Sequence, residues 1–207
     1  MMEYIWSDEQ YRQRFVDISH NIPEEFSSFC NFLINDTNSL LFEGLLNLGE
    51  IKNHEEMKDD PQLWGSLGEE ERQQAEQHYH DESRKAKMNM QLSNMVIQLL
   101  AQVTKNCPDF FVSSDLGEKF SQAVNFCLDQ LTTQKGLKFK IKSPERFHFE
   151  PKELLINLIA MYVNMGHLEK FRQNCVTDAR SYSDETFEKA VSIVASSKKN
   201  VQVDPEI

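Results

Sequence analysis

Apolar side chains recur at steps of three and four residues along most of the chain, which is the spacing of one face of an α-helix. The longest run predicts a helix from Pro23 to about Ile51, with Asn21 as its N-cap and two glutamates in its first turn. One face of this helix consists of apolar and small residues, namely Phe26, Phe29, Cys30, Leu33, Thr37, Leu40, Leu41, Gly44, Leu48 and Ile51.

A second apolar set lies on the other side of the same helix. At about 100° per residue, Phe32, Phe42 and Leu46 fall together opposite the main face. A helix that is apolar on two faces is buried between neighbours. We therefore predict an inner helix of a stacked array, in which Leu46 is buried as well as Leu33. The alternative is that Phe32, Phe42 and Leu46 form an exposed patch that binds a partner.

Asn35 and Asp36 interrupt this apolar helix, because such side chains compete with the helix for backbone hydrogen bonds. Asp36 shares one edge of the helix with Glu25, Glu43 and Glu50, and this edge can be a solvated acidic ridge. Alternatively, the pair supplies a hydrogen bond that holds a neighbouring turn. The sequence leaves both interpretations open.

Helical patterns also flank this element. A short helix before it is expected to end near His20, and its apolar stripe consists of Tyr11, Phe15 and Ile18. Residues 53–65 are expected to form a polar joint, with Pro61 and Gly65 as helix breakers.

A second long helix is expected to start near Leu67, where Ser66 and Glu69 have the spacing of a capping box, and to end at Pro108. Its first part, residues 69–87, is almost entirely polar, which is typical of a helix that is exposed or bridges domains. Its apolar stripe begins later and consists of Met88, Leu92, Met95, Val96, Leu99 and Val103.

The last ninety or so residues continue the helical pattern with one interruption. Residues 137–142 alternate between apolar and basic and predict a short extended segment, with Leu137, Phe139 and Ile141 inward. The helices expected here are one over 115–131, one from Pro151 to the cap Gly166, a short one with Leu168 and Phe171, and one capped by Ser183. The fold class predicted is all-α, an irregular stack of helices of unequal length.

Charge is distributed unevenly along the chain. Residues 1–83 carry 19 acidic and 5 basic residues, whereas residues 84–207 carry 14 acidic and 17 basic residues. The acidic half argues against nucleic-acid binding, because it would repel phosphate. It is either a solvated surface that keeps the chain soluble or an acidic docking surface.

No motif for catalysis, cofactor binding or metal binding is found. The four cysteines form no CxxC pair, and His78 and His80 would point away from each other on a helix. No phosphate-binding loop, dinucleotide fingerprint or hydrolase signature occurs. We therefore expect no catalytic, cofactor-binding or metal-binding residue. The scattered thiols suit a reducing intracellular compartment, and neither a signal peptide nor a membrane span is expected.

One basic stretch remains to be interpreted. Residues 135–152 contain six lysines or arginines, which could bind an anionic partner. However, Glu145, Glu150 and the turn at Pro144 interrupt the stretch, and it lacks a row of aromatic residues for stacking bases. The simpler interpretation is the outward face of an extended connector.

Four segments, taken together, resemble the core of the ubiquitin chain-elongation factors that end in a U-box. They stand in the order found in that family and span residues 31–187. The segments are NFLINDT at 31–37 with Leu40 and Leu41, WGSL at 64–67 with EER at 70–72, SPERFHFEPKELL at 143–155, and RSYS at 180–183 with Phe187. Residues 2–15 are most similar to the A-type of the two animal paralogues.

The resemblance implies a stack similar to an armadillo superhelix and a role in a ubiquitin ligase. Such a ligase extends ubiquitin chains on substrates for proteasomal degradation, in the cytoplasm and also the nucleus. The partners implied are a ubiquitin-conjugating enzyme, which the U-box recruits, ubiquitinated substrates, a segregase ATPase and proteasome-delivery proteins. The competing hypothesis is a helical adaptor without a link to catalysis, which binds partners through its acidic half.

The chain departs from the family pattern in two places. Ala179 stands where the turn before RSYS usually has glycine, which predicts a different turn geometry. We also expect residues 1–197 to be part of the elongating factor core and residues 198–207 to be a linker or truncated end, with the U-box absent. On that expectation the chain alone is an inactive helical scaffold, with no membrane or nucleic-acid partner.

Overall fold

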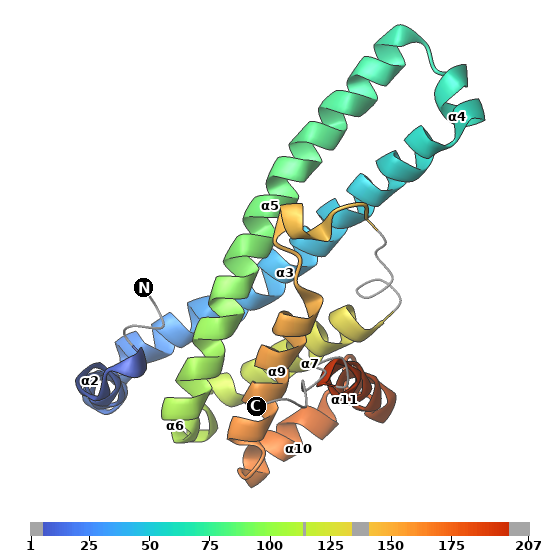
Figure 1. Ribbon diagram of the computed structural model, residues 1–207. Helices are drawn as coiled ribbons and strands as arrows, with labels where there is room; N and C mark the ends of the chain where they lie inside the picture. The colour runs from blue at the N-terminus through green and yellow to red at the C-terminus, as the bar shows by residue number, and fades with distance from the viewer. Residues whose placement is uncertain (1–5, 114, 134–140, 199–207) are drawn as a thin grey trace, which may run out of the picture.

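The structure is a computed structural model that describes residues 6–113, 115–133 and 141–198, and these residues form helices and connecting turns without a strand. The all-α prediction is confirmed. The helices, shown in Figure 1, are α2 (Glu9–Asn21), α3 (Pro23–Asp59), α4 (Pro61–Ser66), α5 (Glu69–Asn106), α6 (Pro108–Ser113), α7 (Leu116–Thr132), the 3₁₀ turn η1 (Pro144–Phe147), α9 (Pro151–Met165), α10 (Glu169–Thr177) and α11 (Asp184–Lys198).

Two long helices, α3 and α5, form an antiparallel hairpin that organises the molecule (Figure 1). They approach closely because Gly44 has no side chain, and a Cβ atom there would lie 2.5 Å from the terminal methyl carbon of Met90. The distal half of the hairpin, closed by α4, projects beyond the other helices, and we call residues 50–80 the arm.

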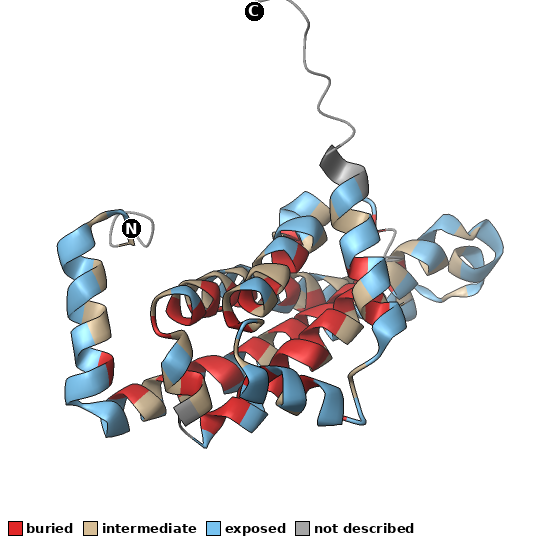
Figure 2. Cartoon of the chain, turned by 90° about the horizontal axis from the view of Figure 1, so that it is seen from below, coloured by how far each residue is buried: buried red, intermediate tan, exposed pale blue. Residues whose placement is uncertain are grey.

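The main core lies around the proximal half of the hairpin. Helix α7 packs against α3, α9, α10 and α11, while α9 also packs against α5. Figure 2 shows the buried residues concentrated in this middle region. The largest side chains that are fully buried include Leu41, Leu48, Met90, Ile97, Leu100, Phe111, Phe120, Leu128, Leu131, Leu154 and Leu155.

The prediction that α3 is an inner helix, buried on both faces, is wrong. Leu33 is 7% exposed, as expected, but Phe32 is 67%, Phe42 39% and Leu46 50% exposed. Helices α5 and α7 cover adjoining sides of α3, and the remaining side faces solvent. The alternative of an exposed patch is therefore the one that the structure supports.

The stripe predicted for α5 is also partly wrong. Met88, Leu92 and Met95 are exposed, whereas Val103 is buried as predicted and Val96 and Leu99 pack against the core. The other core contacts of the helix come from Ala86, Met90, Ile97 and Leu100. Its polar first part is largely exposed, as one of the two expectations had it, while its inner side packs along α3 in the arm.

The predicted polar joint is helical. Helix α3 continues to Asp59, and residues 61–66 form α4, whose N-cap Asp60 accepts hydrogen bonds from two backbone N–H groups. The capping box predicted at Ser66 does not form, because the hydroxyl of Ser66 donates to the carbonyl of Leu63 within α4. Helix α5 instead starts at Glu69 after Gly68, whose N–H donates to the side chain of Glu71 at 2.8 Å. Pro61 therefore separates α3 from α4 as predicted, whereas Gly65 lies within a helix and does not break it.

Helix ends set by proline were predicted better. Helix α5 ends at Asn106, before Pro108, and α9 runs from Pro151 to the cap Gly166. Asn21 is not the N-cap of α3, since it is the last residue of α2 and Ile22 occupies the cap.

The extended segment predicted over 137–142 lies outside the described residues except for its last two positions. Of these, Ile141 is buried and Lys142 is exposed, as expected for the alternation. The linker predicted over 198–207 likewise lies outside the described residues except for Lys198.

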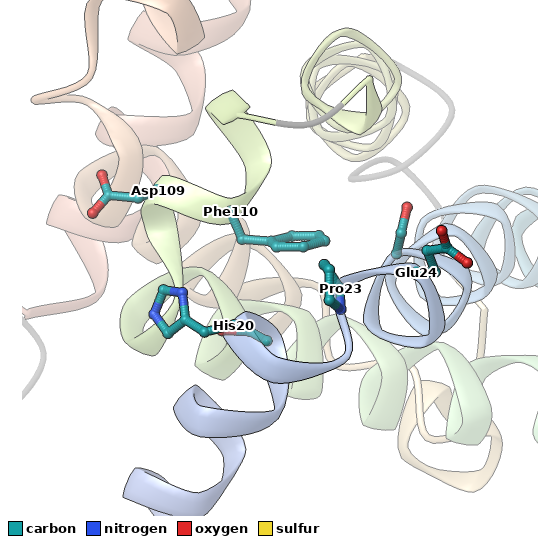
Figure 3. A pocket seen from close by; sticks show the side chains of 7 residues that line it. His20, Pro23, Glu24, Asp109 and Phe110 are labelled. Carbon is teal, nitrogen blue, oxygen red and sulfur yellow. The ribbon is translucent and has the colours of Figure 1, made fainter.

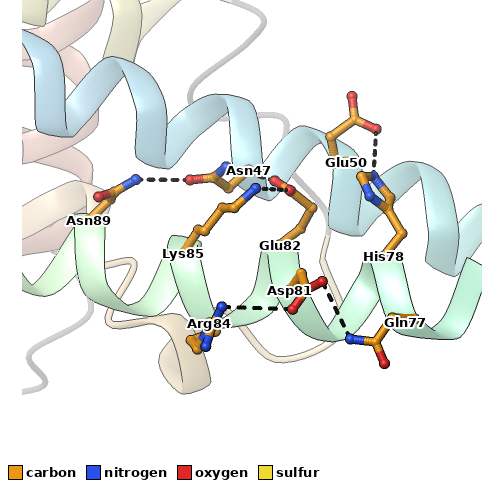
Figure 4. Close-up of polar contacts among 9 residues, drawn as sticks. All are labelled: Asn47, Glu50, Gln77, His78, Asp81, Glu82, Arg84, Lys85 and Asn89. Atoms are coloured by element: carbon orange, nitrogen blue, oxygen red, sulfur yellow. Dashed lines mark hydrogen bonds and ion pairs between the residues drawn. The ribbon is translucent and has the colours of Figure 1, made fainter.

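A buried polar network joins α3 to α5 where the arm leaves the core (Figure 4). The carboxylate of Glu82, only 6% exposed, accepts from the amide of Asn47 and from the ammonium of Lys85, both at 2.7 Å. The amide of Asn89 donates to Asn47 at 3.0 Å. The hydrogen bond from Lys85 is the main cause that lowers the pKa of Glu82 below its ordinary value of 4.5, against the opposing effect of burial. We infer that this network fixes the register of the two helices.

Replacing single leucines distinguishes the covered from the uncovered side of α3. We expect Leu33→Ala to lower the free energy of unfolding by roughly 2–5 kcal/mol, because it leaves a cavity in the core. Leu46→Ala should change it by no more than about 0.5 kcal/mol, because that side chain is half exposed. Urea unfolding of both variants measures this, and comparable losses at the two positions would contradict the packing described.

The Glu82 network should make stability depend on pH. We expect Glu82→Gln to cost roughly 1–3 kcal/mol near neutral pH, because Lys85 and Asn47 lose a charged acceptor. The folded pKa of Glu82 lies below its unfolded value, so its contribution is complete above pH 4.5 and is lost as the pH falls through the lowered value. Urea unfolding over this range should therefore show wild type and variant converging in acid, and a difference that does not change with pH would disprove the assignment.

Candidate docking groove

The described residues contain no cluster suited to nucleophilic or metal chemistry. No group of three or more His, Cys, Asp or Glu side chains among them could hold a metal ion. Burial raises the pKa of the Cys30 thiol to about 12 and that of Cys175 to about 11, and the pKa values of Cys107 and Cys127 are also raised. Such thiols are poor nucleophiles at neutral pH. Among the described residues, no helix is long and apolar enough to cross a bilayer.

A hollow near the N-terminus carries no catalytic arrangement either. It has a volume of about 560 Å³ and lies between the end of α2, the start of α3 and α6. Figure 3 shows the Phe110 ring beside Pro23, with His20 and Glu24 on different sides of the ring. The ring packs edge-on against Phe26, with centroids 4.7 Å apart. The hollow therefore marks the joint between α2 and the rest of the fold.

The most distinctive surface feature is a groove of about 610 Å³ between α3, α7 and the turn from α10 to α11. Two of the four family-like segments meet here although they are far apart in the sequence. The first contributes Ile34 and Asn35, and the second contributes Arg180 and Ser181 at the end of the turn 177–181. The lining consists of Ile34, Asn35, Asn38, Lys119, Gln122, Phe126, Thr177, Asp178, Ala179, Arg180 and Ser181.

The turn beside the groove is held by α7. Asn125, 1% exposed, donates its amide to the carbonyl of Cys175 at 3.0 Å and to the carboxylate of Asp178 at 3.1 Å. Its carbonyl oxygen accepts from the hydroxyl of Tyr162 at 2.7 Å. The other oxygen of Asp178 accepts from the backbone N–H of Arg180 at 3.2 Å. Asn125 thus satisfies the hydroxyl of Tyr162 and one carboxylate oxygen of Asp178, while the carbonyl of Cys175 also accepts from the backbone N–H of Asp178.

These contacts answer two questions that the sequence left open. Asp36 is exposed, as the acidic-ridge interpretation predicts, and the residue that holds the neighbouring turn is Asn125 rather than Asn35 or Asp36. Ala179 fits its turn without strain, because His148 is the only non-glycine residue with positive φ in the part of the chain that the structure describes. Asn125 gave no signal in the sequence, where it is one of several polar residues on the helix predicted over 115–131.

The outer edge of the groove is apolar. The rings of Phe42 and Phe126 lie 6.1 Å apart, with Phe126 in the lining and Phe42 outside it. Leu46, one turn after Phe42, and Phe32 extend this exposed surface along α3. A hollow with amide and cationic groups and an aromatic flank suits the binding of a protein segment. We call the groove and this flank the docking groove.

The chain is similar to a known protein family and to several individual proteins. The model of the ubiquitin elongating factor core family matches residues 1–204. The chain is similar to ubiquitin conjugation factor E4 ufd-2 of Caenorhabditis elegans, with 30% identity over 191 residues that cover 92% of the chain and 19% of the relative. For ubiquitin conjugation factor E4 A of Bos taurus, the identity is 30% over 202 residues, or 94% of the chain and 19% of the relative.

A fungal relative has nearly the same similarity. E4 ubiquitin-protein ligase UFD2 of Saccharomyces cerevisiae is 29% identical over 185 residues, which cover 89% of the chain and 19% of the relative. The chain therefore spans about a fifth of the length of these relatives.

Removing Asn125 should weaken the wall of the docking groove. We expect Asn125→Ala to lower the free energy of unfolding by roughly 2–3 kcal/mol, because Asp178 and Tyr162 keep buried polar atoms without partners. Gln122→Ala, one turn earlier on α7 and exposed, is the matched control and should change stability by at most about 0.5 kcal/mol. Urea unfolding of both variants tests this, and equal effects would show that Asn125 has no special role.

Proposed function

Because the chain belongs to the ubiquitin elongating factor core family, we propose that it serves as a helical scaffold within a ubiquitin ligase that lengthens ubiquitin chains. The substrates would be proteins that already carry ubiquitin and are destined for the proteasome. The observation that carries the proposal is the family match over residues 1–204. The names of the relatives support the reaction class, since they are ubiquitin conjugation factors and a ubiquitin-protein ligase.

The structure indicates what this part of such a ligase would do. The four cysteines that the structure describes are buried with raised pKa values, so they are unsuited to carry ubiquitin as a thioester. The docking groove, by contrast, offers an exposed apolar flank beside hydrogen-bonding groups. We therefore assign this region to holding partners and assign the transfer of ubiquitin to other parts of the machinery.

The partners would be those of the family. We propose a ubiquitin-conjugating enzyme recruited by a U-box, ubiquitinated substrates, a segregase ATPase and proteasome-delivery proteins, acting in the cytoplasm and the nucleus. The alternative is a helical adaptor without a link to ubiquitin transfer, and the exposed flank of the docking groove is equally compatible with it. Both hypotheses require partner binding, but only the first requires that the partners belong to chain elongation.

A chain-elongation assay separates the two. The 207-residue chain, mixed with activating enzyme, conjugating enzymes, ubiquitin and ATP, should give no chain growth above the background without ligase. Added in excess to the full-length S. cerevisiae relative, it should slow that enzyme's chain growth by about tenfold at saturation, because it occupies shared partners. Gel analysis of ubiquitin chains over time measures both effects.

Two double variants make the competition specific. Phe42→Ser with Leu46→Ser should abolish the inhibition, because it removes the flank of the docking groove. Met88→Ser with Leu92→Ser, which changes equally exposed apolar residues on α5, should leave the inhibition intact. Chain growth by the 207-residue chain itself would reject the scaffold assignment, and wild-type chain without inhibitory effect would favour the unrelated adaptor.

A further inference from the structure

The docking groove, to which the proposed function assigns partner binding, is lined mainly by polar groups. Eight of its eleven lining residues are polar or charged, and the other three are Ile34, Phe126 and Ala179. A partner helix that binds through an apolar face would leave many of these polar groups without hydrogen bonds. The lining therefore favours a partner that brings hydrogen-bonding groups of its own.

Helix α3 contributes two amide side chains with free hydrogen-bonding groups. Asn38 is half-buried, and its side-chain oxygen accepts from the thiol of Cys127 at 3.4 Å. Its Nδ2 group donates to no residue that the structure describes. Asn35 is exposed, and its side chain makes no hydrogen bond within the described part of the chain. Side chains three residues apart on a helix are about 5–6 Å apart, so this wall presents the two amides side by side.

The turn on the other side of the groove has free backbone groups. The N–H of Arg180 donates to the carboxylate of Asp178 at 3.2 Å. The N–H groups of Ala179 and Ser181, before and after it, donate to no residue that the structure describes. Ala179 is exposed and Ser181 is half-buried, and both line the groove. Hydrogen-bonding groups are therefore available on two sides of the groove.

The two cations of the lining are also free. Lys119 of α7 and Arg180 of the turn are exposed, and neither side chain forms an ion pair with a described residue. The single carboxylate of the lining, that of Asp178, is 7% exposed and already accepts two hydrogen bonds. The exposed Asp36 and Glu118 lie outside the lining. The lining thus has a formal charge of +1, from two free cations and one engaged carboxylate.

We propose that the docking groove binds an extended segment of a partner protein, with at least one acidic side chain and one aromatic or aliphatic side chain. The N–H and C=O groups of an extended segment are free to bond with Asn35, Asn38 and the turn, whereas those of a helix are bonded within the helix. Neighbouring side chains of such a segment can reach different walls, an acidic one at Arg180 and an apolar one at Phe126. The inference rests on the proposed role of the groove in holding partners.

A phage-displayed library of random dodecapeptides, selected on the 207-residue chain, tests which segments bind. We expect the selected peptides to be rich in Asp and Glu, to share an aromatic or large aliphatic residue, and to tolerate proline, which a helix interior does not. The strongest binder is then labelled with fluorescein and titrated with the chain by fluorescence polarisation. Binding should be saturable.

Variants of the chain locate the peptide. Arg180→Glu should weaken its affinity by about tenfold, because attraction to an acidic side chain becomes repulsion. Lys87→Glu, the same change of sign at an exposed position of α5 outside the groove, is the matched control and should leave the affinity unchanged. Asn38→Ala should weaken binding by about fivefold, because one amide donor is lost. Asn35→Ala gives a second test at an exposed side chain without intramolecular contacts, and urea unfolding verifies that each variant is folded.

Changes in the peptide test its conformation. Methylation of single backbone nitrogens should weaken binding by about tenfold at alternate positions, because each removes one N–H donor of the peptide. A peptide locked as a helix by a hydrocarbon staple should not bind.

The proposal is overturned if no peptide binds saturably, if the selected peptides are basic, if the stapled helix binds as tightly as the free peptide, or if Arg180→Glu has no more effect than Lys87→Glu. A chain that is dimeric in light scattering and becomes monomeric as Arg180→Glu would show that a second copy fills the groove, which also overturns it. None of these readouts involves ubiquitin, so failure here and failure of the scaffold role are distinguishable.

Discussion

The close contact between α3 and α5 is the constraint on which the rest of the structure depends. At Gly44 the two helices are so near that a methyl group would collide with Met90. This distance brings Asn47 within reach of Glu82, so the apolar contact and the buried polar network reinforce each other. The proximal half of the hairpin then provides the surfaces on which α7 and α9 pack, and the distal half becomes the arm.

The docking groove forms because α7 makes contacts on two of its sides. Its apolar side packs on α3, while Asn125 on the same helix holds the turn between α10 and α11. The distance between the walls of the groove is therefore set by the core rather than by surface contacts. Residues 177–181 can carry functional side chains on a short turn because one buried amide fixes its backbone.

The sequence predicted the fold class, the proline-defined helix ends and the family. It failed where the decisive partner is distant in the sequence. The polar residues of 53–59 stay helical because α5 packs against them, and no local pattern reveals this. The apolar side chains of Phe42 and Leu46 were assigned to a core because hydrophobicity alone does not distinguish a buried face from a binding face. His54 carries no signal in the sequence, since its burial depends on Trp64 and Tyr79, which belong to other helices.

The arm carries a small aromatic cluster of His54, Trp64 and Tyr79, and Tyr79 also packs against the main core. Residues 55–81 include no buried residue, so the tip of the arm should open at a lower free energy than the main core. The arm can open from its tip while the main core stays folded, and amide hydrogens beyond Glu82 should exchange with solvent through this local opening. A partner that binds the arm would therefore order the tip of the arm without disturbing the helices that carry the docking groove.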